Sequence, residues 1–292
     1  MIMVIKEIIS KPLSQYTKGT GLNTFCPRSI YSDLIAGCPA KKAGKPCVYC
    51  FNEILEKRYG FKRSFERGFK LKELKQWLTR RPGRLFNELK NIKVVRINAN
   101  TDFYPEFDKI NADHIDIFTR SKIKVIAITK QDLKKIPLAI EAIKRNGGHV
   151  QTTFNFLDTK KAKDFEPYWT DINQRKSSIE YYVKKMPKNI VLRISPIIIG
   201  VNDKEIEDII NWFKSIGGKK VIIHFLRKST PELIGLIKKY HGKIPIKAGE
   251  FYYDKEMIPV IEKLKKIDIK INICGEYDLN KKYSYSSKCC FI

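Results

Sequence analysis

The chain has 292 residues, 43% of them hydrophobic, which is enough for one large α/β barrel or two modest domains. Lys6 interrupts the apolar start, and no stretch of about 18 apolar residues occurs, so we expect neither a secretory signal nor a membrane span. The formal net charge is +26. A positive field of this size attracts nucleic acid and other polyanions, although lysines on outer helix faces also promote solubility without binding anything.

In chain order, residues 1–27 form an N-terminal lead-in and residues 29–35 the first expected strand. Further strands are expected at 93–97, 122–128, 149–156, 190–195, 221–225 and 267–274, with helices at 71–91, 138–145, 205–216 and 254–266. Strand and helix signals that alternate in this way predict a parallel sheet, curved or closed as a barrel. No internal repeat or flexible linker interrupts the pattern, so residues 1–292 are expected to form a single domain that ends in a tail at 275–292.

The seven cysteines are clustered near the two ends of the chain. In a chain without a signal peptide this clustering favours metal binding in a reducing compartment over disulfides, so we expect a cytoplasmic protein. Histidine offers no comparable pattern, because no ligand spacing relates His114, His149, His224 and His241. A metal centre in this chain is therefore expected to rest on cysteine.

Three of the cysteines lie in one short loop after the first expected strand. Eight residues separate Cys38 from Cys47, and two separate Cys47 from Cys50. Thiolates at the shorter spacing can bind one metal centre from a single turn. A closed zinc or iron–sulfur site has four protein ligands. Either a distant cysteine such as Cys26 completes a structural zinc loop, or the fourth position stays open for a ligand that takes part in chemistry.

Several motifs follow one another at the expected strand ends. They are Cys47-Val-Tyr49-Cys50, Asn98-Ala-Asn100-Thr101-Asp102-Phe-Tyr-Pro105, Thr129-Lys130, Glu166-Pro167 with Arg175, and Arg193-Ile-Ser-Pro196 leading to Gly200-Val-Asn202-Asp203. Over residues 30–230 this order resembles the radical S-adenosylmethionine (SAM) superfamily, and within it the spore photoproduct lyase-like branch. The gap between Cys38 and Cys47 is longer than the usual spacing, and in this it is similar to the elongator-type acetyltransferase branch.

The resemblance implies a partial (β/α) barrel of the radical SAM type with a cysteine-containing C-terminal tail. It implies a [4Fe–4S] cluster held by Cys38, Cys47 and Cys50, with one iron left for SAM. An electron from a reductant such as flavodoxin or ferredoxin would cleave SAM and give a 5′-deoxyadenosyl radical. In such enzymes the cofactor supplies the chemistry, and the protein binds, orients and excludes water.

The resemblance also implies a set of cofactor-binding residues. Asn98, Asn100 and Thr101 would hold the methionine end of SAM. Thr129, Thr153 and Asn155 would meet the ribose, and Arg193 the carboxylate. Glu166 would pair with Arg175 or face the sulfonium, and Tyr49 fills the aromatic place of the cysteine motif. For each of these residues the alternative is a polar side chain of the barrel interior that is satisfied by its neighbours.

The C-terminal region adds further cysteines. Cys274 closes the last expected strand, and Cys289 and Cys290 follow in the tail. With Cys26 they would form a second site, either an auxiliary iron–sulfur cluster or zinc; otherwise they are ordinary thiols. The spore enzyme is understood to use a barrel cysteine as hydrogen-atom donor, but here no cysteine lies between Cys50 and Cys274.

The favoured hypothesis is a radical SAM enzyme that acts on nucleic acid or a nucleotide-like substrate. One alternative is a zinc-stabilised basic nucleic-acid-binding protein without catalytic activity. Another is a radical SAM enzyme that acts on a peptide or a small metabolite. The sequence does not specify the catalytic residues, the substrate or the oligomeric state.

Overall fold

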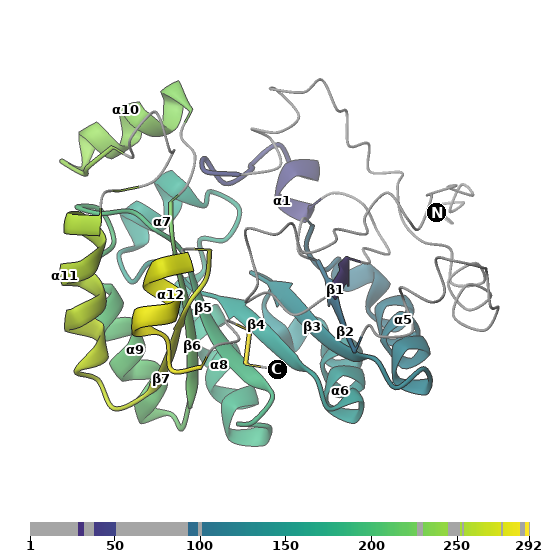
Figure 1. Cartoon of the computed structure of the whole chain (residues 1–292). Helices are drawn as coiled ribbons and strands as arrows, with labels where there is room; N and C mark the ends of the chain where they lie inside the picture. Colours follow the sequence, from purple (N-terminus) through teal and green to yellow (C-terminus); the bar gives the residue numbers. More distant parts are fainter. Residues whose placement is uncertain are drawn as a thin grey trace, which may run out of the picture.

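Seven parallel strands form one sheet in the computed structural model, and they follow the order of the chain from β1 to β7 (Figure 1). The structure describes residues 29–31, 38–50, 93–98, 101–226, 230–244, 252, 254–275, 277–286 and 290–291. The strands are β1 (Ser29–Tyr31), β2 (Val94–Ile97), β3 (Lys124–Thr129), β4 (His149–Thr153), β5 (Ile190–Ile197), β6 (Lys220–Phe225) and β7 (Lys270–Ile273). Among the described strands β1 and β7 are the two edges, so the sheet is open.

Helices follow the strands along the chain, and most of them pack on the outer face of the sheet (Figure 1). They are α1 (Pro39–Lys42), α5 (Asp108–Arg120), α6 (Pro137–Asn146), α7 (Thr159–Phe165), α8 (Ile172–Lys185), α9 (Ile206–Ser215), α10 (Pro231–Lys239), α11 (Asp254–Lys265) and α12 (Tyr277–Tyr283), with 3-10 turns η2 (Pro105–Phe107) and η3 (Leu133–Lys135). The predicted α/β fold with a parallel sheet is confirmed, in its open form. The helix expected at 71–91 and the lead-in at 1–27 lie outside the described residues.

Alternation along the strands separates an outer face from an inner one. Outward residues such as Val125, Val150 and Leu192 join the large core with the helices. Helices bury the outward side chains of strands β2 to β7, so apolar residues alternate there with the residues of the opposite face. The opposite residues form what we call the inner face: Val94, Arg96, Ile126, Ile128, His149, Gln151, Thr153, Arg193, Ser195, His224 and Asn272.

Local signals in the sequence explain where several of these helices begin and end. The Asp158 side chain accepts from Lys160 N at 2.8 Å at the start of α7, and Asp171 accepts from Gln174 N at 2.8 Å before α8. Each such N-cap stabilises a helix by about 1 kcal/mol. Helix α6 ends at Gly147, whose φ of 70° is readily adopted only by glycine.

The C-terminal tail returns to the sheet. Asn272 and Ser286 bond to each other twice, at 2.9 and 3.0 Å, and Tyr285 N donates to Ile271 O at 2.9 Å. Beyond this segment Cys290 is buried against Val94 and Ile126 of the inner face. The end of the chain therefore covers Val94 and Ile126 on the inner face.

Candidate functional site

The cysteine loop begins where α1 begins. Cys38 is the N-cap of this short helix, with Pro39 in its first turn, and Cys50 N donates to Cys47 O at 2.9 Å to close the second turn. Val48 N donates to Phe165 O at 3.0 Å, which docks the loop onto the end of α7. All three cysteines are half-buried. The loop therefore presents the three sulfurs from a fixed, partly enclosed segment.

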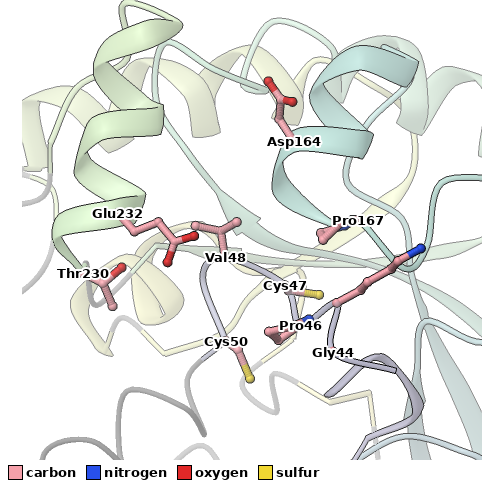
Figure 2. Close-up of a pocket in the computed structure, with 10 residues that line it drawn as sticks. Gly44, Pro46, Cys47, Val48, Cys50, Asp164, Pro167, Thr230 and Glu232 are labelled. Atoms are coloured by element: carbon pink, nitrogen blue, oxygen red, sulfur yellow. The ribbon is translucent and has the colours of Figure 1, made fainter. Parts of the chain in front are cut away.

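A cavity of about 330 Å³ adjoins this loop. Figure 2 shows Cys47 and Cys50 between the end of α7, with Asp164 and Pro167, and the start of α10, with Thr230 and Glu232. Asp164 is already bonded, because it accepts from Lys239 Nζ and from the Tyr240 hydroxyl, both at 2.7 Å.

Burial makes the thiolate form costly at this loop. It raises the pKa of Cys38 to about 12, with a further contribution from the nearby Asp102 carboxylate. Burial also raises the pKa of Cys47 well above its ordinary value, against an opposing effect of Lys130. Thiolates are the form that binds metal, and binding releases their protons. A cationic centre is therefore what would stabilise deprotonated sulfur at these positions.

Glu166 is the centre of a buried network beneath the loop. Its carboxylate, with the residue 1% exposed, accepts from the hydroxyl of Tyr49 and from Asn155 Nδ2 at 2.7 Å. Arg175 Nη1 donates to the other oxygen at 3.3 Å, and Lys130 Nζ lies 3.8 Å away. Because Tyr49 immediately precedes Cys50, this network fixes the cysteine loop against strands β3, β4 and the start of α8. Pairing with Arg175 is one of the two roles considered for Glu166 from the sequence.

Asn155 extends the network to β5. Its Nδ2 donates to Tyr49 OH at 2.9 Å and to Ser195 O at 2.9 Å, and its Oδ1 accepts from Ser195 N at 2.7 Å. The amide is thus fully occupied within the protein. Its ribose contact stays a prediction, and so does that of Thr153, which is 3% exposed.

Asp102 joins the ends of β2 and β3. Its carboxylate accepts from Phe103 N at 2.8 Å, from Lys130 N at 2.9 Å and from the Thr129 hydroxyl. Burial raises the pKa of Asp102, and these hydrogen bonds oppose the rise. Thr129 also accepts from Gln131 N at 2.8 Å, so its hydroxyl both donates a hydrogen bond and accepts one.

Residues at the end of β2 form a turn of their own. Thr101 Oγ1 donates to Asn98 Oδ1 at 3.1 Å, and Asn98 has a φ of 57°. Both residues lie at the carboxyl end of β2, as expected. Asn100 lies outside the described residues, and the contacts of all three with SAM stay predictions.

The buried polar atoms that have no hydrogen-bond partner among the described residues include two aromatic donors. They are the Tyr104 hydroxyl, in a residue 3% exposed, and Trp169 Nε1, in a residue 5% exposed. Burial raises the pKa values of Tyr104 and Tyr168, and the nearby Cys38 contributes further to each rise. A buried donor without an acceptor costs about 1–3 kcal/mol, so a polar group bound here would relieve that cost.

The sulfur donors and these polar groups fit an iron–sulfur cluster with a polar ligand. Within the described residues no three His, Cys, Asp or Glu side chains converge closely enough for a single metal ion. A cluster has a different geometric requirement, because each thiolate binds a separate iron and the three sulfurs do not have to surround a single atom. The zinc alternative depends on Cys26, which lies outside the described residues and stays a prediction.

The C-terminal cysteines are brought to the inner face. Cys274 accepts from Arg193 Nη2 at 3.9 Å, and Cys290 from Arg96 Nη2 at 3.4 Å. Cys274 packs against the same small cluster as Cys290. The second metal site stays a prediction, since Cys26 and Cys289 lie outside the described residues.

Sequence reasoning did not select Asp102, Lys130, Tyr104 or Trp169 as site residues. Asp102 and Lys130 were part of quoted motifs, so a search for charged residues directly after strands would have found them. Tyr104 and Trp169 carry no such signal, because only the folded structure shows which hydroxyl or indole nitrogen is buried without a partner.

Comparison with known proteins supports the fold. No protein-family profile matches the chain, and no curated protein matches it by sequence. Among solved structures, SuiB of Streptococcus suis bound to S-adenosylmethionine is similar, with a TM-score of 0.56 and 12% sequence identity. The match covers 90% of this chain and 54% of SuiB, so the chain spans about half the length of that protein. At this identity the likeness shows a shared fold.

Proposed function

We propose that this protein is a radical SAM enzyme, with Cys38, Cys47 and Cys50 holding a [4Fe–4S] cluster. The observation that carries the proposal is the buried network in which Tyr49, from the cysteine motif itself, donates to Glu166. That network anchors the turn of Cys47 and Cys50 beside Lys130 and Asn155, which follow β3 and β4, and α/β barrels have their active sites at the carboxyl ends of their parallel strands. The likeness in fold to a SAM-bound protein supports the same conclusion.

When bound, the reduced cluster would supply the electron that cleaves the sulfonium bond of SAM. The protein's own residues have separate tasks. Glu166 and Arg175 hold Tyr49, and with it the turn that carries Cys47 and Cys50. The half-buried loop limits the access of water and oxygen to the sulfurs. The Tyr104 hydroxyl offers a hydrogen bond to a polar ligand on the side of Cys38.

The assay is SAM cleavage by anaerobically reconstituted protein. After reduction with dithionite, the wild-type protein is expected to convert SAM to 5′-deoxyadenosine and methionine, measured by liquid chromatography and mass spectrometry. Cys50→Ala should abolish the product and lower the iron content. Cys290→Ala, which alters a tail thiol against Val94 and Ile126, is the cysteine control and should retain the product. Colourless wild-type protein with one zinc per chain would overturn the proposal in favour of the zinc-stabilised alternative.

We propose a nucleic acid or nucleotide-like substrate, because a net charge of +26 favours polyanions. Binding of a fluorescent oligonucleotide at increasing salt tests this part separately. A steep fall of affinity with salt is expected, since each neutralised phosphate releases counterions. A flat salt response would instead favour a peptide or small-metabolite substrate, with the SAM chemistry unchanged. A reductant such as flavodoxin or ferredoxin is the partner that the proposal requires.

The described residues contain no helix that is both long and apolar enough to span a membrane.

A further inference from the structure

Arg193 lies in the middle of the inner face. The strand register places it beside Thr153 of β4 and Ile222 of β6, and Ile222 beside Asn272 of β7. Its Nη1 donates to Gln151 Oε1 at 3.0 Å, and its Nη2 to Cys274 Sγ at 3.9 Å. The side chain is half-buried, so the guanidinium is partly removed from water while solvent can still reach it.

The charge of Arg193 is balanced differently from that of the other cations of the site. Arg175 and Lys130 both lie against the Glu166 carboxylate, at 3.3 and 3.8 Å. Arg193 has a neutral amide and a thiol as its partners, and within the described residues it makes no ion pair with a carboxylate. A guanidinium carries five N–H donors in a planar fork, so donors remain for an oxyanion. Partial burial without an opposite charge makes such an anion favourable there.

The position of Arg193 lies between the cysteine network and the tail. Ser195, two residues nearer the carboxyl end of β5, bonds to Asn155 and so belongs to the network that holds the cysteine loop. Two residues of a strand span about 7 Å. Toward the amino ends of the strands, Cys290 covers two apolar residues of the inner face. Arg193 therefore lies between the residues that Cys290 covers and the network that holds the cysteine loop.

We propose that Arg193 binds a phosphate group of the substrate, with Gln151 and Cys274 holding the guanidinium in place. This inference rests on the proposed function, and it identifies the substrate class as a phosphate-bearing one. Phosphate fits because the guanidinium can donate hydrogen bonds to two phosphate oxygens at once, and because the field of the whole protein attracts polyanions. In this assignment Arg193 serves the substrate, whereas the sequence resemblance assigned it to the SAM carboxylate.

The neighbouring thiol provides a local test. Because Cys274 Sγ lies 3.9 Å from Arg193 Nη2, an anion on the guanidinium should shield this sulfur. The rate of Cys274 alkylation by iodoacetamide is measured on reconstituted protein by peptide mass spectrometry, with inorganic phosphate as the probe and chloride to keep the ionic strength constant. Phosphate should slow the reaction severalfold in the wild type. Arg193→Gln should remove this protection, and Arg193→Lys, which keeps the charge but not the fork, should retain part of it.

Arg145→Gln is the matched control, because Arg145 is exposed and pairs with Asp116 at 3.0 Å. In this variant phosphate should slow the alkylation of Cys274 as much as it does in the wild type. The assignment fails if phosphate leaves the Cys274 rate unchanged, if protection survives in Arg193→Gln, or if succinate protects as well as phosphate. If SAM slows the alkylation of Cys274 and phosphate does not, Arg193 binds the SAM carboxylate and not the substrate. 5′-Deoxyadenosine is assayed on the same samples, so loss of SAM cleavage with phosphate protection intact would refute the enzyme assignment alone.

Discussion

Replacing Glu166 with glutamine should destabilise the protein far more than the same change at a surface ion pair. Glu166 is 1% exposed and Arg175 is 6% exposed, so the variant would leave a buried guanidinium without its counter-charge. Removing one partner of a buried pair costs about 3–5 kcal/mol. Glutamine also places an N–H₂ group where Asn155 Nδ2 donates at 2.7 Å or where Arg175 donates at 3.3 Å, which sets donor against donor.

Glu141→Gln is the matched control. Glu141 pairs with Lys185 at 2.6 Å, but the two side chains are 33% and 42% exposed. A solvent-exposed pair of this kind contributes much less to stability than a buried one. Anaerobic urea unfolding, followed by circular dichroism, gives the free energy of unfolding of both variants. If Glu166→Gln lowers the free energy of unfolding by no more than Glu141→Gln does, the proposed role of the buried network is refuted. Iron retention should fall only in the Glu166 variant, because only that network holds the cysteine turn.

Three further predictions concern pH, packing and the tail. Burial lowers the pKa of His114 to about 3 in the folded protein, whereas its pKa in the unfolded chain is about 6.5. As the pH falls, His114 is therefore protonated in the unfolded chain before it is protonated in the folded protein. The free energy of unfolding should therefore fall below about pH 6.5, by about 1.4 kcal/mol per pH unit. In His114→Leu the slope of this free energy against pH should be smaller by the contribution of one proton. An unchanged slope, measured by urea unfolding at several pH values, would contradict this. Gly148→Ala should destabilise the protein by about 1–3 kcal/mol, because the new Cβ would overlap a carbonyl oxygen of β3. Gly235→Ala should stabilise it by about 0.5–1 kcal/mol, because no described residue packs against this position of helix α10. Equal urea midpoints for the two variants would refute this difference. Asn272→Ala should release the tail and raise the alkylation rate of Cys290 severalfold, and an unchanged rate would show that this residue does not anchor it.

The sheet could be predicted from the sequence because short segments rich in β-branched residues alternate with helical segments, and their outward side chains are apolar. Strand β3 was expected at 122–128 and is Lys124–Thr129, and β6 was expected at 221–225 and is Lys220–Phe225. Helix α6 was delimited by Gly147, which ends it with a positive φ. Helices α5 and α8 were not predicted, because polar and charged residues interrupt their apolar stripes.

The site was predictable only in part. The cysteine spacing and the Glu166–Arg175 pair could be selected because both are local in the sequence. Tyr49 and Glu166 are 117 residues apart, and their hydrogen bond depends on how the loop packs against α7. Cys290 reaches Arg96 across 194 residues. Such contacts are set by tertiary packing, and no pattern within a short segment encodes them.

The most direct measurement is the electron paramagnetic resonance spectrum of the reduced, reconstituted protein before and after addition of SAM. Three protein thiolates leave one iron open, so SAM should shift the signal of the cluster, and Cys38→Ala should lose the signal. A spectrum that SAM does not change, together with evidence of a fourth protein sulfur on the cluster, would contradict the account. Such a cluster would be closed, and SAM could not be cleaved there.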